Sequence, residues 1–227
     1  LLVGTDQDLA PVYHQVLDPM LTLAYAAACT RTIRLGVAVL NLPYLSPAYL
    51  AKQAGTLDVL SGGRAVLGLG TGWSAPEFTA TGSDPRPRGR RTEEYLAVLR
   101  TLWGDPVAEF AGEFYQVPPS VMRPRPVRPG GPPVLLGGTA EVALRRAGRL
   151  TDGWVSSSRA SFDEISRGAQ IVRRAAEEAG RDPDTVQIVV RGVVQAGTRD
   201  DDVPLSGSWE QIRAGAERYA EAGVTEL

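Results

Sequence analysis

The chain has 227 residues, of which 43% are apolar, and its formal net charge at pH 7 is −2. The apolar fraction supports a folded core of one large or two small domains and argues against disorder. A charge so close to zero gives no reason to expect a nucleic acid or a membrane surface as a partner. Cys29 is the only cysteine, which excludes an intramolecular disulfide, and we expect it to be a small buried residue. No apolar run approaches the roughly 20 residues of a membrane helix, and no signal peptide is visible, so we expect a cytoplasmic protein.

The first predicted elements are a helix, a strand, a second helix and a second strand. Asp18 with Pro19 predicts a helix start, and the helix extends to about residue 30. The β-branched run 33–40 predicts a strand. Ser46 with Pro47 predicts the next helix start, and Gly62 with Gly63 its end. A second apolar run at 65–73 then completes a strand–helix–strand unit, which indicates a parallel sheet.

Three glycines alternate at the end of that second strand: Gly68, Gly70 and Gly72. Glycines at such a position let a flat ligand approach the backbone closely. Ligands of parallel α/β proteins bind at the carboxyl ends of the strands. We therefore expect a site formed by residues 40–42 and 70–73.

A polar loop and a third helix follow, with Thr92 as its expected cap and Trp103 near its end. Residues 104–132 form a long proline-rich excursion in which 110–114 resembles a small hairpin. Loops of this length in compact domains are often functional. We interpret 104–132 as a rim or lid insertion over the strand ends.

The next strand, 133–136, ends in Gly137, Gly138 and Thr139 and enters a helix that extends to residue 150. Two glycines, a hydroxyl and a helix N-terminus in succession can bind an anion. The alternative is an ordinary turn in which Thr139 is the N-cap, and Glu141 in the first turn would repel a phosphate. The residues alone leave both interpretations open.

The remaining elements continue the alternation. A short strand at 152–158 leads to a helix with a capping box formed by Ser161 and Glu164. A longer strand is expected at 186–194, then a polar loop at 197–207, a helix at 208–222 and the beginning of a further strand.

This count of five strands and a partial strand favours a closed (β/α)8 barrel, which typically needs about 250 residues. The deficit matches a barrel that lacks roughly its first two strands and most of its last. The alternative, a doubly wound sheet with a dinucleotide fingerprint, fails because Trp73 stands at the third glycine position. We expect a single barrel domain over 1–227 that is incomplete at both ends, as a piece of a longer chain.

Several kinds of chemistry lack their residues. One histidine and one cysteine make a zinc site improbable, and the sequence contains neither a G-x-S-x-G elbow nor a Walker loop. An organic cofactor is a natural source of reactivity when the side chains near the strand ends are this inert.

Nearly the whole chain resembles the luciferase-like monooxygenase superfamily, in its branch of flavin- and deazaflavin-dependent oxidoreductases. The resemblance rests on a set of matching stretches, and residues 82–85 with 88–90 further resemble an actinobacterial subgroup assigned to coenzyme F420. The matching stretches are 17–19, 32–36, 47–53, 57–64, 68–73, 136–139 and 147–154.

The resemblance implies a TIM-like barrel of the bacterial luciferase type with a cofactor at its C-terminal face. It places a strand bulge, often with a non-proline cis peptide, behind the cofactor ring, and it places the cofactor phosphate at the glycine pair. The implied cofactor-binding residues, together with the strand-end residue Asn41, are Ala38, Val39, Asn41, Thr71, Gly72, Trp73, Gly137, Gly138, Thr139 and Ser157. Ser157 is expected to make a further phosphate or ribityl contact.

The implied activity is hydride transfer between coenzyme F420 and a small organic substrate, in a protein that forms a homodimer and binds no metal. The alternatives are an FMN-dependent monooxygenase and a non-catalytic member that binds a ligand or oligomerises. Trp73 stands where some sugar-phosphate dehydrogenases of the superfamily carry a catalytic Glu, so the catalytic residues stay unassigned.

Overall fold

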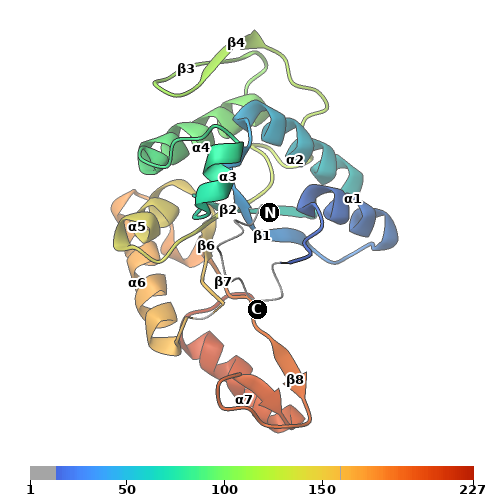
Figure 1. Ribbon diagram of the computed structural model, residues 1–227, viewed down its shortest axis with the longest axis vertical. Coiled ribbons are helices and arrows are strands. Elements are labelled where there is room, and N and C mark those ends of the chain that lie inside the picture. Colours follow the sequence, from blue (N-terminus) through green and yellow to red (C-terminus); the bar gives the residue numbers. More distant parts are fainter. Residues whose placement is uncertain (1–13, 159) are drawn as a thin grey trace. The chain divides into compact units, whose positions relative to one another are not determined.

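Parallel strands alternate with helices along the chain, as the sequence predicts (Figure 1). The computed structural model describes residues 14–158 and 160–227. The chain divides into two compact units, Leu1–Pro133 and Val134–Leu227. The assignment of 1–227 to one domain, with a rim at 104–132, stays a prediction.

The first unit begins with the predicted strand–helix–strand arrangement. Its elements are α1 (Pro19–Cys29), β1 (Leu35–Asn41), the short 3-10 helix η2 (Leu42–Tyr44), α2 (Pro47–Ser61) and β2 (Ala65–Gly70). β1 pairs in parallel with β2, with Leu35 opposite Ala65. All six residues of β2 are buried, which is typical of a parallel strand covered on both faces.

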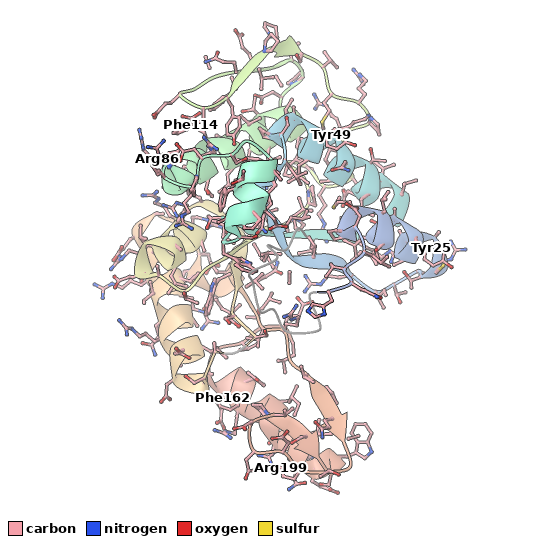
Figure 2. The ribbon with its side chains drawn as sticks, viewed as in Figure 1. Tyr25, Tyr49, Arg86, Phe114, Phe162 and Arg199 are labelled. Atoms are coloured by element: carbon pink, nitrogen blue, oxygen red, sulfur yellow. The ribbon has the colours of Figure 1, made fainter. Side chains whose placement is uncertain are left out.

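The apolar periodicity of the helices explains how they pack. Leu50, Ala54 and Leu57 of α2 are at most 3% exposed, and Met20 and Ala27 of α1 are also buried. Spacings of three and four residues place such side chains on one helix face. The opposite faces carry the exposed aromatic rings Tyr25 and Tyr49, which point outward in Figure 2. Cys29 is exposed, so its expected burial is wrong.

Local capping chemistry sets the helix ends of this unit. The Asp18 carboxylate accepts a hydrogen bond from the Leu21 amide at 2.9 Å. Ser46 occupies the N-cap position of α2 as predicted, although its side chain makes no capping bond. Gly62 and Gly63 have φ values of 67° and 84°, the left-handed conformation expected after the last turn.

The region after β2 differs from the prediction. Helix α3 (Ala75–Ala80) lies where a polar loop was expected, because Pro76 stands in the first turn of a helix, where proline is tolerated. Helix α4 (Arg88–Gly104) begins before Thr92, whose hydroxyl donates to the Arg88 carbonyl within the helix at 2.6 Å. Thr92 is therefore not the N-cap.

The expected hairpin is present as β3 (Ala108–Ala111) paired antiparallel with β4 (Gln116–Ser120). The Glu94 carboxylate on α4 anchors its turn by accepting amide hydrogen bonds from Glu113 and Phe114 at 2.9 Å each and from Tyr115 at 3.3 Å. The hairpin is thus fixed to α4.

The second unit is built on three parallel strands. Its first elements are β5 (Val134–Gly137), α5 (Glu141–Leu150), β6 (Gly153–Val155), α6 (Phe162–Glu178), the 3-10 helix η3 (Pro183–Thr185) and β7 (Gln187–Val189). β6 pairs with both neighbours, so Trp154 lies between Leu136 and Ile188. The carboxyl ends of the three strands meet at one edge.

The last part of this unit corrects the prediction of one long strand at 186–194. Two strands occupy the region, β7 and β8 (Val194–Ala196), and the expected loop 197–207 contains β9 (Leu205–Gly207), which pairs in parallel with β8. Helix α7 (Trp209–Glu221) follows as predicted, and Glu226 bridges to Val189 at the expected start of a further strand.

Helix starts in this unit follow the sequence in part. Ser161 and Glu164 form the predicted capping box at α6. At α5 the N-cap is Ala140, and it provides no side-chain cap. The interpretation of Thr139 as the N-cap is therefore wrong.

Candidate functional site

The first predicted site segment is a bulge in β1. The pairing with β2 shifts between Val37 and Leu40, and the intervening Ala38–Val39 peptide bond is cis, as the resemblance implied. A Cβ atom at Gly68 would overlap the Val37 carbonyl oxygen. The glycine in β2 therefore leaves the space that the bulge occupies.

Gly70 provides a second opening at the end of β2. A Cβ atom there would lie 2.7 Å from Val39 Cγ2 and 3.2 Å from Asn41 Oδ1. Val39 is 38% exposed, and Asn41 pairs with Gly70 in the ladder. The structure thus brings Val39 and Asn41 together over a bare stretch of backbone at the strand ends.

The segment that follows β2 is held from behind. Gly72 has a φ of 75°, and a Cβ atom there would lie 2.7 Å from the Tyr44 hydroxyl oxygen and 2.9 Å from Phe78 Cζ. Arg88 donates to the Gly72 carbonyl at 3.3 Å. Trp73 is 55% exposed, so an aromatic face stands at the edge of this segment.

Sequence reasoning missed Tyr44 and Glu77, which support this segment. Burial raises the pKa of the Tyr44 hydroxyl above its ordinary value, and the Glu77 carboxyl raises it further. Glu77 is itself buried. The only local signal was the position of Tyr44 just after β1, because the contact with α3 depends on a helix that the sequence did not predict.

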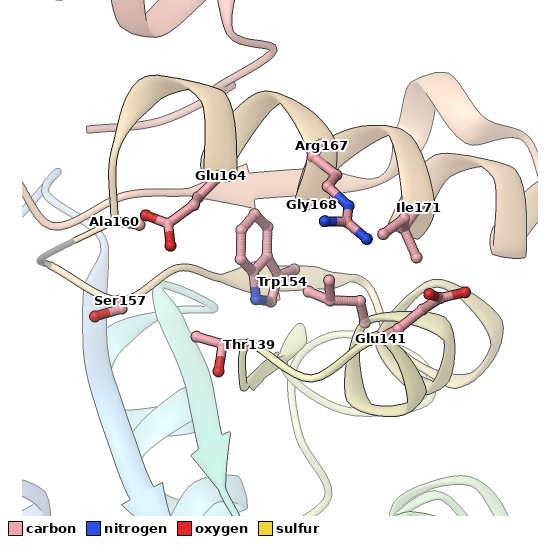
Figure 3. Close-up of a pocket in the computed structure, with 10 residues that line it drawn as sticks. Thr139, Glu141, Trp154, Ser157, Ala160, Glu164, Arg167, Gly168 and Ile171 are labelled. Carbon is pink, nitrogen blue, oxygen red and sulfur yellow. The ribbon is translucent and has the colours of Figure 1, made fainter.

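The second unit contains a pocket of about 290 Å³ (Figure 3). It lies between the start of α5, the end of β6 and the first turns of α6. Its lining residues are Thr139, Glu141, Leu144, Trp154, Ser157, Ala160, Glu164, Arg167, Gly168 and Ile171. Two of the predicted site residues, Thr139 and Ser157, therefore line one cavity.

The glycine pair forms the loop that leads into this pocket. Gly138 has a φ of 141°, a conformation that side-chain-bearing residues rarely adopt. The Trp154 indole N–H donates to the Gly138 carbonyl at 2.8 Å and fixes the loop from below. Gly168 on α6 admits this ring, because a Cβ atom there would lie 2.5 Å from Trp154 Cη2.

The pocket end of α5 suits an anion. Ala140 cannot cap the helix with its side chain, so the first-turn amide groups lack that partner. The Thr139 side chain is exposed beside them. The Glu141 carboxylate, which would oppose an anion, is paired with Arg145 at 3.0 Å.

Three functional candidates in this pocket were missed: Trp154, Glu164 and Arg167. The Glu164 carboxylate accepts hydrogen bonds from the Ser161 amide at 2.8 Å and from its hydroxyl at 2.9 Å, which lower the pKa of Glu164. Trp154 lay within a stretch that carried the resemblance. Arg167 had no distinguishing signal, because a single charge on a helix is usually solvated.

Two searches of the described chain, residues 14–158 and 160–227, gave negative results. In these ranges, no group of three or more His, Cys, Asp or Glu side chains could hold a metal ion. No helix in the same ranges combines the length and apolar character that crossing a bilayer requires.

The chain belongs to the luciferase-like monooxygenase family, whose model matches residues 3–204. A solved F420-dependent secondary alcohol dehydrogenase, in complex with an F420–acetone adduct, has a similar fold. Its TM-score is 0.83 at 18% identity, over 96% of this chain and 80% of that one. The predicted fold class, an α/β fold of the luciferase-like barrel type, is confirmed.

Two curated relatives give the range of this family. An uncharacterized protein of Mycobacterium tuberculosis is 41% identical over 162 residues, 71% of this chain and 54% of that protein. The FMNH2-dependent dimethylsulfone monooxygenase of Pseudomonas putida is 31% identical over 163 residues, 70% of this chain and 44% of that enzyme. The chain thus spans about half the length of these relatives, and the family includes F420- and FMN-dependent oxidoreductases.

Proposed function

We propose that this protein transfers a hydride between coenzyme F420 and a small organic substrate. The observation that carries the proposal is the bulge at Ala38–Val39 over Gly68 and Gly70. It leaves a flat surface made largely of backbone at the carboxyl ends of parallel strands, where ligands of such folds bind. Val39, Asn41, Thr71, Gly72 and Trp73 are the residues that would contact a tricyclic ring.

The second unit supplies the features of a site for the cofactor phosphate. The loop Gly137–Gly138–Thr139 leads to the uncapped start of α5, and Ser157 lines the same pocket. Backbone amide groups and two hydroxyls suit the oxygens of a phosphate ester. The residues present therefore fit the anionic part of a flavin or deazaflavin cofactor.

The protein would act mainly by positioning. Coenzyme F420 supplies the hydride chemistry when it is bound, since its ring favours two-electron transfer. The chain's own residues would orient the ring, and Trp73 would exclude water from one edge. A hydride acceptor held in a fixed orientation needs few reactive side chains, which agrees with the inert composition of the strand ends.

An FMN-dependent monooxygenase is the second candidate. The P. putida relative, whose name describes an FMNH2-dependent monooxygenase, favours it. Oxygen consumption with reduced FMN would identify this activity. A member that binds a ligand without catalysis is the third candidate, and it would bind cofactor without turning over any substrate.

Titration of the protein with coenzyme F420 and with FMN tests the proposal. We expect F420 to bind and to raise the melting temperature, and we expect Gly138→Asp to abolish the effect by placing a carboxylate at the phosphate. A protein that binds neither cofactor would refute both enzyme candidates. Retained affinity in Gly138→Asp would refute the phosphate assignment alone.

We also propose that the protein forms a homodimer. Leu17, Leu21 and Tyr25 at α1 are between 72% and 78% exposed, which supports an apolar contact surface in the first unit. Sedimentation should show a dimer, and Leu21→Glu should shift it to a monomer. A wild-type monomer over the whole micromolar range would contradict this proposal.

A further inference from the structure

The pocket in the second unit has an uneven distribution of charge. Among its lining residues, three are ionised at neutral pH: Glu141, Glu164 and Arg167. Glu141 is paired with Arg145 at 3.0 Å, and Glu164 accepts two hydrogen bonds from Ser161. Within the described part of the chain, Arg167 makes neither a hydrogen bond nor an ion pair. The pocket thus offers one guanidinium that is available to a ligand.

The position of Arg167 separates it from the proposed phosphate contacts. It lies on α6 one turn after Glu164, and the adjacent Gly168 packs against the Trp154 ring. Figure 3 shows the guanidinium extending from α6 toward the α5 side of the pocket, whereas Thr139 and Ser157 lie at the opposite end. A group bound at Thr139 and Ser157 would have to continue along the pocket to meet Arg167.

The two candidate cofactors differ in this respect. FMN ends in a phosphomonoester, which carries nearly two negative charges at neutral pH. In coenzyme F420 the phosphate is a diester with one negative charge, and the chain continues beyond it into a tail that carries carboxylates. Two carboxylates in the pocket wall disfavour a dianion more than a monoanion. A guanidinium farther along the pocket pairs with a carboxylate in bidentate geometry.

We propose that Arg167 binds a carboxylate of the cofactor tail beyond the phosphate and thereby selects coenzyme F420 over FMN. The inference rests on the proposed function, since it concerns the same cofactor. Arg167 is a specificity-determining residue in this scheme. It takes no part in the hydride step.

The test compares Arg167→Gln with Arg174→Gln. Arg174 lies on the same helix two turns later, pairs with Glu178 at 3.1 Å and does not line the pocket. Dissociation constants are measured by fluorescence for coenzyme F420, for FMN and for the same deazaflavin ending at its phosphate. Loss of a charge-assisted bidentate contact should weaken F420 binding about tenfold or more.

For Arg167→Gln we expect the affinities for FMN and for the truncated deazaflavin to change by less than about twofold, within the scatter of neutral surface substitutions. Arg174→Gln should leave all three affinities unchanged, and Arg167→Lys should restore part of the F420 affinity. Melting temperatures check that each variant is folded.

Two outcomes would overturn the proposal without touching the proposed function. Equal weakening of all three ligands would mean that Arg167 binds the phosphate. An unchanged F420 affinity in Arg167→Gln would mean that the tail does not meet Arg167. A wild-type protein that binds neither F420 nor FMN would instead refute the proposed function, and one that binds only FMN would refute the selection of F420.

Discussion

Replacing Gly138 by Ala should destabilise the protein more than an ordinary glycine substitution. Its φ of 141° is a conformation open mainly to glycine, which costs another residue about 1–3 kcal/mol. The added Cβ atom would also lie 2.9 Å from the Ala143 Cβ atom, and such overpacking costs about 1–3 kcal/mol. Together these effects predict a loss of about 2–4 kcal/mol, if the loop keeps its conformation.

Gly62→Ala is the matched control. Gly62 also has a positive φ, 67°, but a Cβ atom there would meet nothing within 4 Å. The left-handed conformation alone costs alanine about 1–2 kcal/mol. The comparison therefore isolates the crowding and the more restricted backbone at Gly138.

The assay is thermal unfolding together with cofactor titration. For a chain of this size 1 kcal/mol lowers the melting temperature by about 2–4 °C, so Gly138→Ala should lower it by about 4–16 °C. The affinity for coenzyme F420 should also fall in Gly138→Ala and stay unchanged in Gly62→Ala. If the two variants have equal melting temperatures and equal affinities, the account of this loop is wrong.

Three further predictions concern other parts of the fold. Gly70→Ala should cost about 1–3 kcal/mol in thermal unfolding and weaken ring binding, whereas Gly36→Ala on the neighbouring strand, where the nearest atoms would be 3.8 Å away, should do neither. Glu94→Ala should remove the acceptor of three hairpin amide groups, at about 1.5–3 kcal/mol, and speed amide exchange in β3–β4; unchanged exchange there would contradict the anchoring role. The pKa of Glu164 is lowered by the amide and hydroxyl of Ser161, so this carboxylate stabilises the fold above its unfolded pKa of about 4.3, and the effect is lost as the pH falls through its folded pKa. Glu164→Gln should therefore destabilise the protein at pH 7 but much less at pH 3 in urea unfolding, and an equal loss at both pH values would refute this linkage.

The features that were predictable from the sequence depend on residues close together in the chain. Asp18 with Pro19 marked the start of α1, and Ser161 with Glu164 formed the expected capping box, since each involves one helical turn. Alternating glycines at 68–72 indicated where the backbone would be exposed. The position of the bulge came from the family resemblance and is confirmed.

The missed features depend on packing between elements. Strands β8 and β9 have only three residues each, too few for a periodic pattern. Pro76 was interpreted as part of a loop, although a proline also fits the first turn of α3. The site residues Tyr44 and Arg167 were missed for the same reason, because their roles depend on contacts with neighbouring helices.

The close approach of Gly68 to the Val37 carbonyl constrains how this family can evolve. A side chain at position 68 requires a β1 without the bulge, and a bulged β1 requires glycine at position 68. A lineage that changes either strand first therefore passes through an intermediate with a steric clash. Descendants should keep or lose the pair together, and engineers who graft this strand pair onto another barrel have to move both strands at once.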